Sequence, residues 1–78
     1  MMTEQDFLGE ISGIVHVDIG SISTDSHLAS FRDWDSLGVV MFIAMADQSC
    51  GICVDPKMLS DCKTVGDLAR LCKIHGDH

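Results

Sequence analysis

The sequence predicts an all-α fold, a bundle of three main helices and one short helix, in which the first connecting loop is long. Three observations indicate this class: apolar residues recur at helical spacing, helix-capping residues stand before these stretches, and no segment alternates between apolar and polar residues as a strand does. The chain has 78 residues, 46% of them hydrophobic, so we expect residues 1–78 to form a single domain around one core.

The first helix is predicted over about residues 3–16. Thr3 is a good N-cap, and Asp6 stands three residues later, as in a capping box. The apolar face of this helix is predicted to consist of Phe7, Ile11, Ile14 and Val15.

Residues 17–34 form a long connection that is rich in turn and cap residues. Apolar residues nevertheless recur through it, namely Ile19, Ile22, Leu28 and Phe31. Long loops without a structural or functional reason are uncommon, so we expect this loop to pack against the bundle.

The second helix is predicted to begin at Asp35 and Ser36 and to end near Asp47 and Gly51, and residues 37–46 within it carry no charge.

Asp55 followed by Pro56 predicts the start of a short third helix, because Asp is a good N-cap and Pro suits the first helical position. Thr64 is expected to cap the last helix, with Asp67 three residues later and Gly76 as its stop. The apolar stripe of this helix is predicted to be Val65, Leu68, Leu71 and Cys72.

The chain is acidic, with 12 Asp and Glu against 5 Lys and Arg and a net charge of −7. This charge disfavours nucleic acids and anionic membranes and favours basic protein partners. We find no signal peptide and no segment long enough for membrane insertion, so we expect a cytoplasmic protein whose cysteines are thiols. A chain this small has no room for separate substrate and cofactor domains, so we expect a monomeric binding or carrier module and no enzyme.

The most informative segment is Asp35-Ser36-Leu37, at the predicted start of the second helix. We expect the Ser36 hydroxyl to be exposed and the free N–H groups of the first helical turn to point toward the same region. A phosphate ester on this serine would meet those donors and the positive end of the helix dipole. The alternative is that Asp35 or Ser36 is only an N-cap, which is a common role for both residue types.

At this segment the chain resembles the acyl carrier proteins, which have an Asp-Ser-Leu motif at the start of their second helix after a long first loop. The resemblance covers roughly residues 3–74, although the N-terminal third matches by pattern only. Residues 31–37, 50–54, 55–62 and especially 63–68 resemble the corresponding parts of that family.

The resemblance implies that a phosphopantetheinyl transferase (holo-acyl-carrier-protein synthase) moves 4′-phosphopantetheine from coenzyme A onto Ser36, using Mg²⁺ in the transferase. Asp35 would assist at the transferase site, and Leu37 would lie in the partner contact. The arm would carry thioesters between acyl-loading and acyl-processing enzymes of fatty-acid, polyketide-like or other specialised acyl biosynthesis. Peptidyl carriers and D-alanyl carriers, whose Ser-Met-Gly is similar to Ser36-Leu37-Gly38, remain alternatives.

Many carriers of fatty-acid synthesis have acidic residues along the second helix, whereas this chain has none there before Asp47. Because a small bundle cannot bury every face of one helix, we expect an exposed apolar strip that contacts partners of a dedicated pathway. With Leu37, its members are predicted to be Val39, Met41 and Met45, with Gly38 on the same face. Residues that could line an acyl pocket, or form ordinary core, are Val40, Ile43, Met58, Leu59, Cys62 and Leu68.

The cysteines allow an alternative hypothesis about the class of protein, namely that the chain is a small structural zinc module. Cys50 and Cys53, followed by Cys72 and His75, have a spacing close to that of a zinc ribbon. A zinc ribbon would leave the capped first helix and the long loop unexplained, so we expect no metal. A redox pair of Cys50 and Cys53 is also disfavoured, because it would lie at the C-terminal end of a helix, where the dipole opposes thiolate formation.

Overall fold

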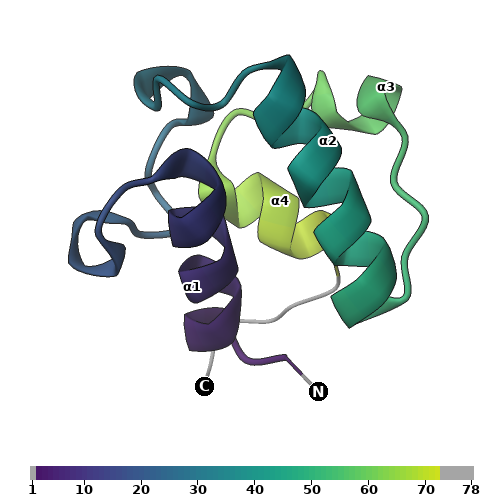
Figure 1. The fold of residues 1–78 in the computed structure, drawn as a ribbon, viewed down its shortest axis with the longest axis horizontal. Helices are drawn as coiled ribbons and strands as arrows, with labels where there is room; N and C mark the ends of the chain where they lie inside the picture. Colours follow the sequence, from purple (N-terminus) through teal and green to yellow (C-terminus); the bar gives the residue numbers. More distant parts are fainter. Residues whose placement is uncertain (1, 73–78) are drawn as a thin grey trace.

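The computed structural model describes residues 2–72, and within this range the chain is helical and contains no strand. The helices are α1 (Glu4–Val15), α2 (Ser36–Met45), α3 (Pro56–Leu59) and α4 (Val65–Leu71). Figure 1 shows α1 and α2 packed side by side in opposite directions, with α4 lying across them and α3 at the edge of the bundle. The predicted all-α fold of three main helices and one short helix is confirmed.

Local capping explains where α1 begins and ends. The Thr3 hydroxyl accepts the N–H of Asp6 at 3.1 Å, and the Thr3 N–H donates to the Asp6 carboxylate at 3.2 Å. The helix ends at His16, which adopts the left-handed conformation with φ of 57°. The residues of α1 that are buried are the four predicted, Phe7, Ile11, Ile14 and Val15.

The core is centred on Phe42 of α2, whose side chain is fully buried. Its ring meets Phe7 edge-on at a centroid distance of 6.2 Å and Trp34 at 6.0 Å. Such edge-to-face pairs stabilise beyond the area they bury. These contacts tie α1, α2 and the end of the long loop to one another.

The long loop packs against the bundle and contains two 3₁₀ turns, η1 (Ile19–Ser21) and η2 (Leu28–Ser30). Ile22, Leu28 and Phe31 are buried, as predicted. The fourth of these residues, Ile19, remains 38% exposed, so the loop packs against the bundle mainly through the other three.

Backbone hydrogen bonds fasten this loop to the start of α4. Three N–H groups donate across the junction: Leu28 to the Lys63 carbonyl at 2.9 Å, Val65 to Ser26 at 3.0 Å and Gly66 to Thr24 at 2.9 Å. Because the loop is held at its middle, its last residues reach α2 along a defined path, which Figure 1 shows between the end of α1 and the start of α2.

The helical path of α2 continues through a π-helical turn, η3 (Ala46–Cys50), and ends at Gly51, whose φ is 65°. The predicted end near Gly51 is therefore correct, with one wider turn before it.

The two remaining helices begin at the predicted caps. The Asp55 carboxylate accepts the Lys57 N–H at 2.8 Å before α3, and Thr64 with Asp67 forms a full capping box before α4. The predicted stop at Gly76 lies outside the described residues. No helix in residues 2–72 is long and apolar enough to cross a membrane.

Candidate functional site

Ser36 is the first residue of α2, and its side chain is exposed as predicted. The cap is Asp35, whose carboxylate oxygen accepts the N–H groups of Leu37 and Gly38, both at 3.1 Å. Asp35 therefore provides the N-cap, and the Ser36 hydroxyl is not needed for it.

The same hydrogen bonds correct one expectation about this helix end. The first-turn N–H groups of Leu37 and Gly38 were predicted to be free for a phosphate, but the Asp35 carboxylate already occupies both. The positive end of the α2 dipole is thus offset by the negative charge of Asp35.

The residues before the motif are held by α1 and by the core. The Asp33 carboxylate lies 2.8 Å from Nδ1 of His16, the C-cap of α1. Trp34 is half-buried, and its ring packs against Phe42. The turn that presents Ser36 is consequently held by α1 through Asp33 and by the core through Trp34.

One side of α2 exposes apolar side chains next to Ser36. Leu37 is 68% exposed, Val40 61% and Met41 41%, and Ala44 is exposed as well. We call Leu37, Val40, Met41 and Ala44 the apolar strip. No exposed residue of α2 carries a charge.

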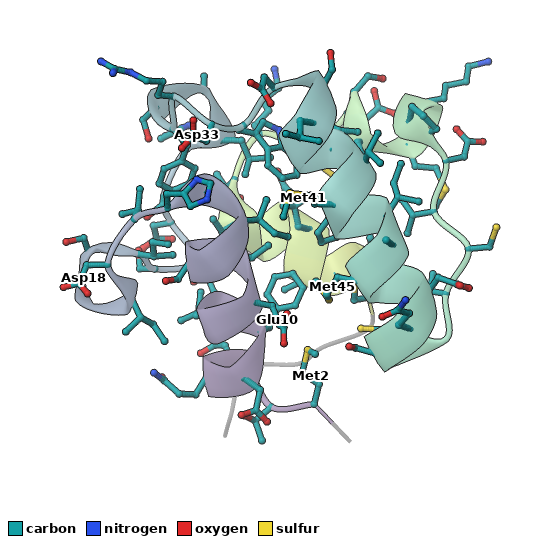
Figure 2. All side chains as sticks on the ribbon, in the orientation of Figure 1. Met2, Glu10, Asp18, Asp33, Met41 and Met45 are labelled. Atoms are coloured by element: carbon teal, nitrogen blue, oxygen red, sulfur yellow. The ribbon has the colours of Figure 1, made fainter. Side chains whose placement is uncertain are left out.

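The strip exists as expected, but its membership differs from the prediction. Met45 is only 9% exposed and belongs to the core, and Gly38 is buried too. Val39 is half-buried and packs against the core. Figure 2 shows Met41 and Met45 along α2, one turn apart, and the inner of the two is Met45. The face of α2 that packs on the core includes positions 38, 42 and 45, so a partner cannot touch these residues without opening the core.

The residues predicted to line an acyl pocket are exposed in some cases and buried or half-buried in others. Val40 and Met58 point into solvent, with 61% and 39% of each exposed, so these two predictions were wrong. Leu59 and Leu68 are buried in the core. Ile43 and Cys62 are half-buried and pack against it.

The four cysteines are free thiols. Burial, together with a hydrogen bond to the adjacent Cys50 thiol, raises the pKa of Cys72 to about 12. Burial also raises the pKa of Cys62, whereas Cys53 is exposed.

Within residues 2–72, no three side chains of His, Cys, Asp or Glu come close enough to hold a metal ion. Cys50, Cys53 and Cys72 therefore do not form the partial zinc site that their spacing allowed, and the fourth candidate, His75, lies outside the described residues. Cys50 is the last residue of the helical path of α2 and Cys53 follows it, and this C-terminal helix end is a poor place for a reactive thiolate.

In this small helical domain, the exposed Ser36 hydroxyl at the start of α2 is accessible to a covalently attached group. The chain belongs to the phosphopantetheine attachment site family, whose model matches residues 5–72. Domains of this family are the site of covalent 4′-phosphopantetheine attachment and are generally carriers rather than catalysts. No curated protein and no solved structure matched the chain.

This membership confirms the predicted family and the predicted cofactor. A carrier domain implies interaction with a transferase that attaches the arm and with enzymes that process the cargo. The residues present fit such an arm, since a free hydroxyl stands at the solvent-facing start of α2 and the surrounding turn is fixed.

Proposed function

We propose that Ser36 is the attachment residue and that the protein carries acyl intermediates on its arm. The Asp-Ser-Leu motif supports this choice, because Asp35 caps α2 and the Ser36 hydroxyl therefore stays exposed. Three of the other serines are engaged in hydrogen bonds, since the hydroxyls of Ser12, Ser30 and Ser60 donate to backbone carbonyls at 2.6–2.7 Å.

The attachment chemistry needs little from the carrier itself. The Ser36 oxygen displaces adenosine 3′,5′-bisphosphate from coenzyme A, and the transferase removes the hydroxyl proton. When bound, the arm supplies a terminal thiol that holds cargo as a thioester. A flexible tether of this kind raises the effective concentration of cargo at each partner active site.

The apolar strip supports a further part of the proposal, which concerns the partners. Leu37, Val40 and Met41 lie within two turns of Ser36 and offer an uncharged surface. A partner with an apolar docking site fits this surface better than one that relies on basic side chains alone. We propose, therefore, that the partners are dedicated enzymes of a specialised acyl pathway.

The cargo is proposed to be an acyl group because the net charge of −7 and residues 63–68 resemble acyl carriers more than the peptidyl or D-alanyl carriers. Incubation of the arm-bearing protein with loading enzymes of each class distinguishes these cargoes. Acceptance of an aminoacyl group alone would contradict the acyl assignment while leaving the carrier function intact.

The attachment site is tested by intact mass spectrometry after incubation of the protein with coenzyme A, Mg²⁺ and a permissive transferase. We expect one added phosphopantetheine on the wild type and none on Ser36→Ala. Ser21→Ala, which removes another exposed serine, is the matched control and is expected to be modified fully. Modification of Ser36→Ala, or no modification of the wild type by several transferases, contradicts the proposal.

A further inference from the structure

We propose that Gly38 and the backbone carbonyl of Asp33 form a contact that positions Ser36 for phosphopantetheinyl transfer. This inference rests on the proposed role of Ser36 as the attachment residue. It assigns a function to Gly38, which lies two residues after the serine and is buried.

The contact is too close for any residue other than glycine. A Cβ atom built on Gly38 would lie 2.5 Å from the Asp33 carbonyl oxygen and 3.5 Å from its carbonyl carbon. Real Cβ atoms essentially never come within 3.0 Å of another heavy atom, so a side chain here would force the backbone of Asp33 away. The same Cβ would also lie 3.7 Å from the Ile14 side chain of α1, so this position is packed between Asp33 and α1.

Asp33 is itself held in place. Its carboxylate contacts Nδ1 of His16 at 2.8 Å, and Figure 2 shows Asp33 beside the end of α1. The next residue, Trp34, packs on Phe42 in the core. Residues 33 and 34 are therefore clamped between α1 and α2, and only Asp35 separates them from Ser36.

This arrangement matters for the transfer step. A bond forms between the Ser36 oxygen and the phosphorus of phosphopantetheine, the pyrophosphate bond of coenzyme A breaks, and the hydroxyl proton is lost. Transfer of this kind needs the attacking oxygen in line with the leaving group, and a misplacement of about 1 Å can cost about 100-fold in rate. Gly38 acts through the backbone next to the serine, so we describe it as a positioning residue.

The test compares Gly38→Ala with Gly13→Ala. Both glycines lie inside helices, so both substitutions bring the same gain in helix propensity, but a Cβ on Gly13 meets nothing within 4 Å. Transfer from coenzyme A is measured with purified transferase, at a temperature where circular dichroism shows each variant folded. We expect kcat of Gly38→Ala to fall about tenfold or more with little change in KM, because the exposed apolar strip is untouched. Gly13→Ala should stay within about twofold of the wild type.

The outcomes separate this inference from the proposed function. If Gly38→Ala transfers as well as Gly13→Ala while the wild type is modified, the positioning role is overturned and the attachment site stands. If KM alone rises, Gly38 affects docking, and the positioning role is overturned as well. If the wild type itself is never modified on Ser36, the proposed function has failed.

A second variant covers the case in which Gly38→Ala does not fold. Asp33→Ala removes the exposed contact to His16 and leaves the buried Gly38 contact in place, so the fold is preserved. We expect its kcat for transfer to fall several-fold at unchanged KM, since residue 33 is then held on one side only. A kcat equal to that of the wild type would overturn the premise of the inference, that a firmly held backbone at residue 33 positions Ser36.

Discussion

At the scale of single residues, Asp35 combines a structural role with a position beside Ser36, the proposed attachment residue. Its carboxylate satisfies two N–H groups of α2, which explains why a helix without a charged residue in its first turn still begins sharply. The phosphate of an arm on Ser36 would lie close to this negative charge rather than to free donors. The two roles of Asp35, cap and charge, can be separated by mutation.

Asp35→Asn retains an oxygen that can cap α2 but removes the charge, whereas Asp35→Ala removes both. We expect the asparagine variant to keep its free energy of unfolding within about 0.5 kcal/mol of the wild type, and the alanine variant to lose about 1 kcal/mol. Chemical denaturation measures both values. If transfer to Ser36 slows equally in the two variants, the charge is what the transferase uses. Equal stability of the two variants would show that the cap contributes little.

The residues that sequence reasoning located best are those whose role is local. Thr3, Asp35, Asp55 and Thr64 were all predicted as helix starts, because a cap depends on residues two or three positions away. The Asp33 contacts were missed, because His16 lies 17 residues from its partner and no pattern links the two.

At the scale of elements, α2 shows where the sequence becomes ambiguous. Its residues 37–46 are uncharged throughout, so the helical period that separates buried from exposed positions in α1 is absent. The prediction of an exposed strip was correct, but Met45 was placed outside and Val40 inside. The packing of α1 against α2, which depends on the whole fold, decides the orientation of this helix.

The apolar strip predicts the effect of adding charge to α2. Val40→Glu introduces a carboxylate on a side chain that is 61% exposed, so the fold and the attachment of the arm should be unaffected. We expect turnover by an acyl-processing partner to fall about tenfold, because an apolar docking site would have to accept a charge. Steady-state kinetics with the loaded carrier measure this.

The matched control for Val40→Glu is Ile19→Glu. It makes the same change in net charge on another exposed apolar residue, in η1 and away from the strip. Equal losses for the two variants would mean that net charge, and not the strip, governs turnover.

The capping box of α4 predicts a pH dependence of stability. Hydrogen bonds from the backbone N–H groups of Lys63 and Thr64 lower the pKa of Asp67 below its ordinary value of 3.8. A lowered pKa in the folded state means that the carboxylate stabilises the fold above about pH 3.8 and that this contribution is lost as the pH falls through the folded pKa. Asp67→Asn should therefore be less stable than the wild type at pH 6 and lose less stability between pH 6 and pH 3. Unfolding curves at both pH values check this, and parallel losses would contradict it.

At the scale of the whole molecule, one aromatic cluster holds the parts together. Phe42 contacts Phe7 of α1 and Trp34 of the loop, and no part of its side chain reaches solvent. Only 5% of the residues are aromatic, and the sequence could not show that these few would meet at one point. Likewise, the backbone hydrogen bonds between the long loop and α4 leave no trace in the side-chain pattern.

Phe42→Ala should be the most damaging single change in this cluster. Truncation of a buried Phe costs about 3–5 kcal/mol, and a domain of this size has about 3–5 kcal/mol of stability in total. We expect the variant to be largely unfolded at 25 °C by circular dichroism, with Phe42→Leu folded but destabilised. A cooperatively folded Phe42→Ala variant would show that the cluster is not central.

Trp34 is the only tryptophan of the chain, and it stands two residues before Ser36 with its ring against Phe42. Its fluorescence therefore reports from a single known place, with no label attached. Emission from this ring senses both the packing of the core and the surroundings of the serine-bearing turn. A stopped-flow trace of tryptophan emission can thus follow arm attachment and partner docking in real time, in the unmodified sequence.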